Sequence, residues 1–343
     1  MVNEAVRYQD PSVALDATAA ERADNYSAQT ALYATHKRIL ALQEELASGS
    51  LVEGKSGNTI FVTKTSGGEY ESLQAAVDAA VAGDVVVVGP GSWGEVVLKA
   101  GVSLMGLQPP LADTVVLSKI SFAPAEGTAA DNTVYVSNLR LSRGDNETVA
   151  VLGGDGAPVR IHLDGVRFYR NNAGATNPLV ICGGEDASSS IFMHNCSLTH
   201  EGGQVANAII LLFASVRYLD LNNCTFSQGG HCLATTYGTV AASLCRFETT
   251  SSIAAIHVSG TGSQLAVGNS LVRNLGTNSS GIQLEAGTVC AASDTVFDVS
   301  AGTGKCVGGT GVLAKNNLTV QPAALGSRNT STTGPTVLSF QVL

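Results

Sequence analysis

The chain has 343 residues, a formal net charge of −9 at pH 7 and 38 glycines, and only 14% of its residues are charged. This composition is typical of many short strands joined by tight turns, and the negative charge argues against a basic surface that would bind nucleic acid. No apolar run is long enough to cross a membrane, and no N-terminal apolar segment indicates a signal peptide. We therefore expect no nucleic-acid partner, no membrane insertion and no signal-dependent secretion.

Residues 1–50 are predicted to form a helical stalk. No proline or glycine occurs between Leu15 and Ala47, where alanine, glutamate, glutamine and leucine dominate. Apolar residues fall at heptad spacing at Leu32, Ile39, Leu42 and Leu46. A narrow apolar stripe on an otherwise polar helix predicts a coiled coil that joins several copies of the chain. A single amphipathic helix lying on the rest of the protein is the alternative.

A short amphipathic helix is predicted over residues 71–82, and Gly83 ends it. Its apolar positions follow the i, i+3, i+4, i+7 pattern at Leu73, Ala76, Val77 and Ala80. A helix in this position would cover the first coil of the repeats that follow, whose strand edge would otherwise be open to aggregation.

A repeat of roughly 26 residues organises the chain up to residue 320. It is marked by eight apolar anchor residues, Leu141, Phe168, Leu198, Phe226, Phe247, Val272, Phe297 and Val320. Three residues before the anchors stand the bend residues, Asn138, Gly165, Asn195, Asn223, Leu244, Asn269, Asp294 and Asn317. All but Leu244 are of the types that adopt a left-handed backbone at low cost. A bend that recurs in this way predicts coils stacked on one another.

Two further positions define the inside of each coil. Seven residues before the anchors lies the inward column, which is apolar throughout: Val134, Ile161, Ile191, Leu219, Val240, Leu265, Cys290 and Leu313. Five residues before them lies a second such position, broken only by Lys315. Positions two apart point to the same face of a strand, and a third apolar run follows in most coils. Three short strands per coil predict a parallel β-helix with like side chains stacked inside and no internal cavity for a substrate.

Seven cysteines are present, and three of them, Cys196, Cys224 and Cys245, share one inward position. We expect buried free thiols, although neighbouring coils would bring two of them within disulfide range. No cysteine or histidine spacing indicates zinc, and no aspartate cluster indicates calcium. The sequence therefore predicts neither a metal site nor a cofactor.

The position six residues before each anchor should point outward. It is occupied by Tyr135, His162, Phe192 and Asp220 in the first coils and by Ala241, Ala266, Ala291 and Ala314 in the later ones. A row of four alanines suits close packing against another copy of the chain. Cover by a loop of the same chain is the alternative.

Residues 69–107 resemble the opening of pectin-lyase-like right-handed β-helices, in AAVDAA followed by GDVVVVGPGSWGE and GVSLMG. This resemblance implies a mainly-β chain with a right-handed single-stranded parallel β-helix over residues 51–320. Together with the helical stalk, the whole chain resembles a bacteriophage tailspike or tail fibre. The resemblance implies a homotrimer in the virion tail, made in the host cytoplasm and attached by residues 1–50 to a phage tail or adaptor protein. Residues 321–343 resemble a C-terminal cap or closing strand.

A catalytic site is not evident in the sequence. Glycoside hydrolysis needs two carboxyl groups about 5–10 Å apart, and the fallback candidates, Asp164 and Asp220, fall in different outward columns. His194 shares the column of Asp164 one coil further on. The run Gln228–His231 resembles a polygalacturonase motif but lacks the aspartate pairs that belong with it. We therefore assign no catalytic residue.

Two functions follow from the resemblance. The first is adhesion to a host cell-surface polysaccharide through the variable turns at residues 142–158, 169–189 and 199–208, where glycine and small polar residues cluster. The alternative is a tailspike enzyme on the same fold, a hydrolase or lyase that degrades that polysaccharide.

Overall fold

The computed structural model divides the chain into two units, Met1–Ser56 and Gly57–Leu343. The predicted stalk, with Leu32, Ile39, Leu42 and Leu46, lies outside the described residues. The structure describes residues 57–64, 69–107, 115–122, 132–145, 148–153, 158–172, 177–182, 189–201, 210–212, 216–228, 230–250, 252–276, 280–299, 305–316, 319–321 and 336–339.

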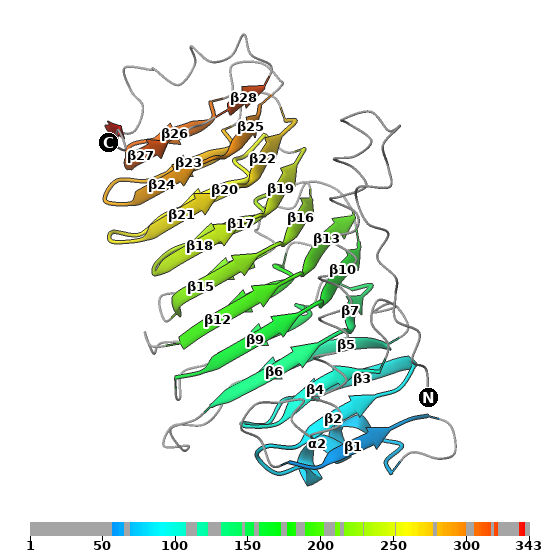
Figure 1. The fold of residues 1–343 in the computed structure, drawn as a ribbon. Coiled ribbons are helices and arrows are strands. Elements are labelled where there is room, and N and C mark those ends of the chain that lie inside the picture. The colour runs from blue at the N-terminus through cyan, green and yellow to red at the C-terminus, as the bar shows by residue number, and fades with distance from the viewer. Residues whose placement is uncertain are drawn as a thin grey trace, which may run out of the picture. The chain divides into compact units, whose positions relative to one another are not determined.

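The described strands of the second unit form two parallel sheets (Figure 1). Sheet A has 12 described strands, and each pairs with the equivalent strand one coil away. In spatial order these are β1 (Thr59–Val62), β2 (Val85–Val88), β4 (Ser103–Gly106), β6 (Thr133–Ser137), β9 (Arg160–Asp164), β12 (Ser189–His194), β15 (Val216–Asn222), β18 (Thr239–Ser243), β21 (Gln264–Gly268), β24 (Val289–Ser293), β27 (Val312–Asn316) and β29 (Thr336–Ser339).

Sheet B has 17 described strands and takes two from most coils. It begins with the long strands β3 (Gly91–Val97) and β5 (Val115–Phe122). The first strands of the later coils are β7 (Arg140–Arg143), β10 (Arg167–Asn171), β13 (Ser197–Glu201), β16 (Thr225–Gln228), β19 (Arg246–Thr249), β22 (Leu271–Asn274), β25 (Val296–Asp298) and β28 (Thr319–Gln321). The second strands are β8 (Ala150–Leu152), β11 (Val180–Cys182), β14 (Ile210–Leu212), β17 (Leu233–Thr235), β20 (Ile256–Val258), β23 (Ile282–Leu284) and β26 (Val307–Gly309).

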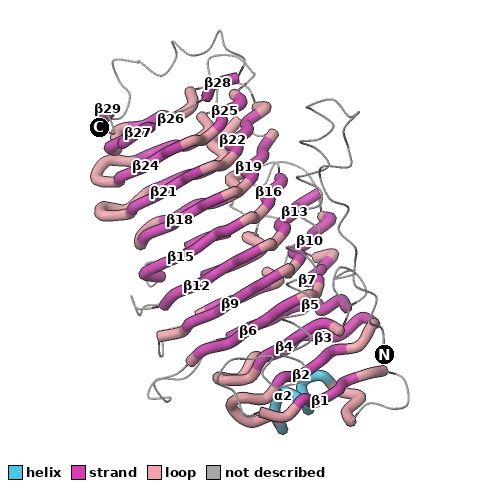
Figure 2. The backbone as a smooth tube through the Cα atoms, viewed as in Figure 1, coloured by secondary structure: helices cyan, strands magenta, loops and turns pink. Residues whose placement is uncertain are grey.

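This arrangement confirms a mainly-β parallel solenoid of about eight turns, and Figure 2 shows its strands repeated coil over coil. After the undescribed segment 322–335, β29 pairs in parallel with β27 and adds a further strand to sheet A.

The helix before the coils, α2 (Leu73–Ala79), is shorter than the predicted 71–82. It begins where the Ser72 hydroxyl accepts a hydrogen bond from the Ala75 amide, and it ends because Ala80 already has an extended backbone. Its buried face packs beside β1, β2 and β3 at the start of the stack. Within the described part of the chain, no helix is both long and apolar enough to cross a bilayer.

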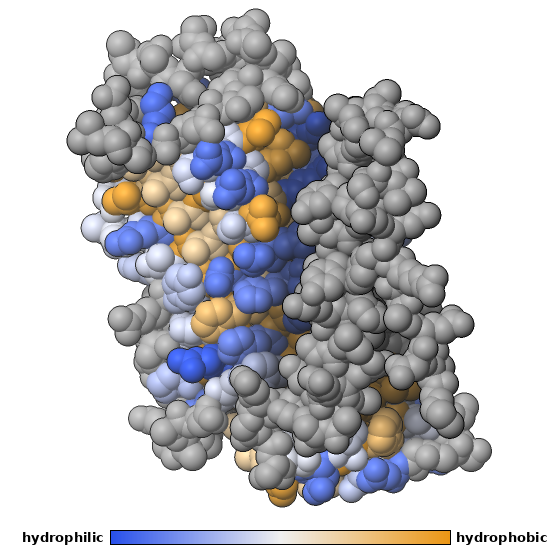
Figure 3. All heavy atoms as spheres, in the orientation of Figure 1, coloured by the Kyte–Doolittle hydropathy of each residue, from blue (hydrophilic) through white to orange (hydrophobic). Residues whose placement is uncertain are grey.

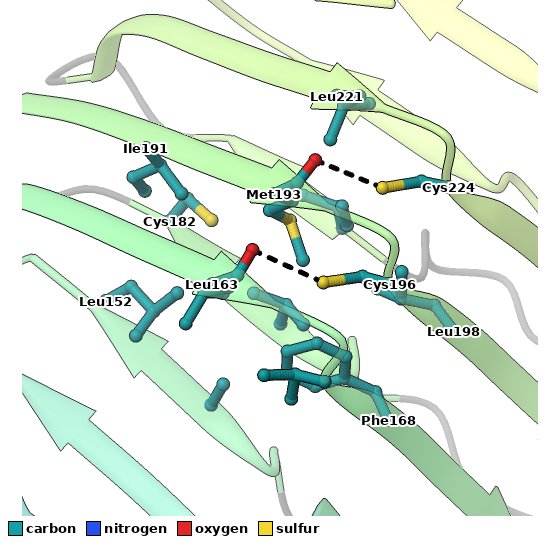
Figure 4. Close-up of a cluster of buried hydrophobic side chains, with 14 of the residues drawn as sticks. Leu152, Leu163, Phe168, Cys182, Ile191, Met193, Cys196, Leu198, Leu221 and Cys224 are labelled. Atoms are coloured by element: carbon teal, nitrogen blue, oxygen red, sulfur yellow. Dashed lines mark hydrogen bonds between the residues drawn. The ribbon is translucent and has the colours of Figure 1, made fainter. Parts of the chain in front are cut away.

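The inward column forms the core as predicted. None of its eight side chains is more than 4% exposed, and the seven anchors with described side chains are at most 1% exposed. Full burial of one such side chain contributes about 1.5–3 kcal/mol, so these columns are a main source of stability. Leu163, Met193 and Leu221, from the second inward position, face this core (Figure 4).

The bend residues adopt the left-handed backbone in every described coil. Their φ angles are 56° at Asn138, 64° at Gly165, 54° at Asn195, 52° at Asn223, 56° at Leu244, 48° at Asn269 and 47° at Asp294. Asn317 lies outside the described residues. Leu244 has the same backbone although its residue type does not favour it. Its amide donates to the Gly268 carbonyl (3.2 Å), as the amides of five other bend residues donate to carbonyls of the next coil.

All seven cysteines are free and buried. The thiol of Cys196 donates to the His194 carbonyl (3.2 Å) and more weakly to Leu163 in the neighbouring coil (3.6 Å). Cys224 bonds Met193 in the same way at 3.2 Å, as Figure 4 shows. Contact with the Cys196 thiol, together with burial, raises the pKa of Cys224 to about 12. The Cys224 thiol therefore remains protonated, and both cysteines act as small core side chains that donate to backbone carbonyls.

Candidate functional site

The strongest candidate site is a groove on the outer surface of sheet B. Side chains alternate along a strand, so the residue just before each buried anchor points outward. In four successive coils the residues at this position are Arg140, Arg167, Ser197 and Thr225, which are paired in register. They line an open groove of about 640 Å³. The groove therefore runs across the strands, along the direction in which the coils stack.

Arg140 is held by a ring from the neighbouring coil. Its guanidinium lies 4.4 Å from the centroid of the Tyr169 ring, and both side chains are half-buried. A cation over an aromatic face is attracted by the ring quadrupole, and the flat guanidinium stacks well there. Arg167 is exposed at the adjacent position. The groove thus has a cationic end whose geometry is fixed on one side by an aromatic ring.

A ladder of side-chain amides forms the wall between this groove and sheet A. Asn223 Nδ2 donates to Asn195 Oδ1 at 2.8 Å, and Asn195 Nδ2 donates to Asp164 Oδ1 at 2.7 Å. Asn195 and Asn223 line the groove and are also bend residues. The same backbone feature that turns each coil therefore places a hydrogen-bonding group on the rim of the site.

Beyond this wall, sheet A carries a ladder of aromatic rings. Tyr135 stacks on His162 with 4.7 Å between centroids, and His162 stacks on Phe192 with 4.6 Å. Tyr218 meets Phe192 edge-on at 6.0 Å. Because the stacked rings cover one another's faces, they present mainly edges to the solvent. The ladder therefore offers little of the open ring face on which a sugar would stack.

The two fallback carboxylates lie in separate surroundings. Asp164 is on β9 and Asp220 on β15, so two strand spacings of about 4.8 Å separate them along the stack. Asp164 accepts the Asn195 amide, whereas Asp220 lies 3.8 Å from His194 Nε2. This places a histidine beside one carboxylate rather than the two carboxylates side by side. The arrangement lacks the paired acids that glycoside hydrolysis uses.

The polygalacturonase-like run ends at His231, whose ring is engaged in a second outward stack. Its Nδ1 lies 2.6 Å from the Ala254 carbonyl, and its ring stacks on His257 at 5.2 Å. His257 Nε2 lies 3.1 Å from Glu285. Burial lowers the pKa of His231. Over the described ranges, no three or more His, Cys, Asp or Glu side chains are arranged to hold a metal ion.

Sequence reasoning missed Arg140, Arg167 and Tyr169. The repeat itself contains the signal, because these residues immediately precede or follow the anchors Leu141 and Phe168. Reading the outward neighbours of the anchors as columns would have found them. The variable turns expected to bind the ligand lie only partly within the described residues.

The predicted alanine row lies on sheet A in the later coils. Ala241, Ala266, Ala291 and Ala314 are paired in register and line a shallow groove of about 410 Å³. Ala266 and Ala291 are exposed, and pale orange atoms gather on the upper half of this face in Figure 3. The flanking residues Ser243, Gly268 and Ser293 are also small. The row therefore forms a face of small side chains, with Lys315 at its last coil.

No protein-family model and no curated protein sequence matches the chain. Among solved structures, a pectin methylesterase from Aspergillus niger is 15% identical, with a TM-score of 0.40 over 85% of this chain and 93% of that one. Pectin methylesterase from carrot is 14% identical, with a TM-score of 0.39 over 84% and 89%. The A-module of the mannuronan C-5 epimerase AlgE4 from Azotobacter vinelandii is 12% identical, with a TM-score of 0.33 over 78% and 95%. Similarity at this level assigns no activity to the chain.

Proposed function

We propose that this protein is an adhesin of the bacteriophage tailspike type, which holds a host cell-surface polysaccharide on the outside of its solenoid. The observation that carries the proposal is the groove across β7, β10, β13 and β16, together with a core that stacked side chains fill. A filled core leaves the outer surface to bind a ligand.

The layout of the groove supports a polymeric ligand. Neighbouring coils lie about 4.8 Å apart, so the groove offers one outward side chain per coil at regular spacing. Hydroxyl groups from Ser197, Thr199 and Thr225 and amides from Asn195 and Asn223 line it. Such groups form hydrogen bonds with the hydroxyl groups of a sugar chain, and an open groove lets that chain continue beyond both ends.

The proposal places the protein in the virion tail as a homotrimer. Residues 1–50, with their heptad stripe, would form the stalk that binds a phage tail or adaptor protein. The alanine row supports the same assembly, because small side chains let two sheet faces approach closely. The alanine row serves as the contact between copies within the trimer. The groove lies on the other sheet, so this contact leaves the groove accessible.

A polysaccharide-degrading enzyme is the second candidate. The observation that favours it is the 3.8 Å approach of His194 to Asp220 on the outer face of sheet A. A histidine beside a carboxylate can act in proton transfer. The separate placement of Asp164 weakens this reading, since the second acid is two strands away.

Binding of the full-length protein to purified bacterial capsules and lipopolysaccharides tests the proposal. We expect at least one polysaccharide to be retained without release of reducing ends or unsaturated sugars. Thr225→Val, which removes a groove hydroxyl, should weaken retention, and Thr239→Val on sheet A, away from the groove, should leave it unchanged. Failure to retain any polysaccharide contradicts the adhesin, and release of cleaved sugars supports the enzyme instead.

A further inference from the structure

We infer that the groove binds a glycan with N-acetylated amino sugars and that Asn223 and Leu244 hold one of its acetamido groups, an inference that rests on the polysaccharide-binding function proposed above. The two are bend residues of successive coils, and the residues just before them, Asn222 and Ser243, are paired in register. Neighbouring strands lie about 4.8 Å apart, so the two side chains leave the rim of the groove one coil apart. Both are exposed, so a ligand can reach them.

The amide ladder determines which atom Asn223 offers to a ligand. An ionised carboxylate only accepts hydrogen bonds, so Asp164 Oδ1 receives the amide group of Asn195, at 2.7 Å. The carbonyl oxygen of Asn195 therefore faces Asn223 and accepts its amide group at 2.8 Å. This makes Asn223 Oδ1 the terminal acceptor, and no donor from the described residues reaches it. A ligand meets an acceptor whose orientation is already set, which reduces the entropy lost on binding.

Leu244 interrupts the ladder where an asparagine would continue it. Leucine is unfavourable here for two reasons, because φ is 56° and because the side chain is 58% exposed. Backbone strain of this kind clusters at functional sites. An asparagine at this position would donate to Asn223 Oδ1, as Asn223 donates to Asn195. The leucine leaves that acceptor open and places an apolar side chain next to it.

An acetamido group matches this pair of features. It is a planar trans amide, so its N–H and its methyl group lie on the same side, away from its carbonyl oxygen. The N–H donates to Asn223 Oδ1 while the methyl group contacts Leu244. A sugar hydroxyl supplies the hydrogen bond but has no methyl group, so it leaves the apolar surface of Leu244 in water. Thr225, which lines the groove, offers its hydroxyl to the rest of the sugar.

The first experiment changes the acyl group of the ligand. The full-length protein is tested against purified capsules and lipopolysaccharides with and without N-acetylated sugars. Each retained polymer is then de-N-acetylated, and portions of it are re-N-acetylated or N-formylated. We expect retention of N-acetylated polymers only, its loss on de-N-acetylation and its recovery on re-N-acetylation. The formyl group keeps the N–H but has no methyl group, so the N-formylated polymer should bind about fourfold more weakly than the re-N-acetylated one.

The outcomes separate this inference from the function on which it rests. Retention of a polymer without N-acetyl groups overturns the inference but leaves the adhesin, and so does equal retention after de-N-acetylation. Equal binding of the N-formylated and re-N-acetylated polymers also overturns the inference, because the methyl contact is then absent. Retention of no polymer overturns the adhesin itself.

The second experiment tests the rim on the retained N-acetylated polymer. Leu244→Asn should weaken binding about tenfold, because the new amide occupies Asn223 Oδ1 and the apolar contact is lost with it. Leu244→Met keeps an apolar side chain and should bind nearly as well as the wild type. The matched control is Asn269→Gly, which changes the next bend residue, outside the groove, and should bind normally. Unchanged binding by Leu244→Asn, with an unfolding temperature no lower than that of the wild type, overturns the inference.

Discussion

The guanidinium of Arg140 lies 4.4 Å from the centre of the Tyr169 ring, so two residues from successive coils form one end of the groove. We expect Tyr169→Ala to weaken polysaccharide binding about tenfold, because an orienting ring is lost together with its contact area. Tyr169→Phe keeps the ring and should bind nearly as well as the wild type. Affinities measured by biolayer interferometry on the retained polysaccharide check this. Equal losses in the two variants would show that the hydroxyl matters and the ring does not.

Leu244 is the one described bend residue that is neither glycine, asparagine nor aspartate, yet its φ is 56°. Its side chain is 58% exposed, so replacing it removes little packing. We expect Leu244→Asn to stabilise the fold by about 1 kcal/mol, because asparagine tolerates this conformation better. For a unit of this size, that is a rise of about 2–4 °C in the unfolding temperature. Calorimetry of Leu244→Asn and of the control Leu244→Ala would show whether the gain is specific to asparagine.

Leu219 lies in the middle of the inward column and is fully buried. Leu219→Asp places an unpaired charge in the stack, which we expect to destabilise the coils by about 4 kcal/mol or more and to abolish soluble protein. The adjacent Asp220 points outward, so Asp220→Asn should change the unfolding temperature little. Soluble yield and thermal unfolding of the two variants provide the comparison. Normal yield of Leu219→Asp would mean that the inward column is misassigned.

The proposed trimer has two independent contacts. Leu42→Asp should lower trimer content without changing the unfolding temperature of the coils, because it alters only the predicted stalk. Adding Ala266→Glu should yield monomers, since charge enters the alanine row. Sedimentation velocity measures both effects. The control is Gln264→Glu, which adds the same charge on the same strand and face but outside the row; if it dissociates the trimer equally, the row is not the contact.

His200 is 5% exposed and is paired in register with buried Arg170. Burial, and then the charge of Arg170, lower the pKa of His200 below its usual 6.5. The unfolded chain therefore binds a proton that the folded chain does not, so the free energy of unfolding falls as the pH drops below 6.5. We expect the urea midpoint to decrease from about pH 7 to pH 5, and His200→Gln to reduce that decrease. An identical pH dependence in the variant would exclude this contribution.

The solenoid follows from the sequence because its cause is repeated. Every coil has an apolar residue seven positions before its anchor and a bend residue three positions before it. The prediction of stacked coils therefore does not depend on a chance match in any single coil. The length of α2 was overestimated, because the pattern at Ala80 fits a helix while the backbone must already turn towards β2. The periodicity of apolar residues predicts which face of a helix is buried, but it does not predict the residue at which the helix ends.

The groove was less accessible to prediction because it depends on pairs of side chains. The register predicts that Arg140 and Arg167 are neighbours, but the stacking of Arg140 on Tyr169 depends on rotamers. The ion pair between Arg143 and Glu95 joins residues from distant parts of the chain in the same way. The rings of Tyr135, His162 and Phe192 were placed correctly on the outside, yet only the structure shows that they cover one another.

The pairing of each strand of sheet A with its equivalents in the adjacent coils makes the length of the molecule adjustable. Asn195 and Asn223 are 28 residues apart and occupy the same place in successive repeats. If that stretch were removed, Asn223 would follow His194 as Asn195 does now, and β12 would lie beside β18. Duplication of such a stretch would lengthen the molecule by one unit. Genetic change can therefore alter the reach of the protein in whole steps while leaving both of its ends intact.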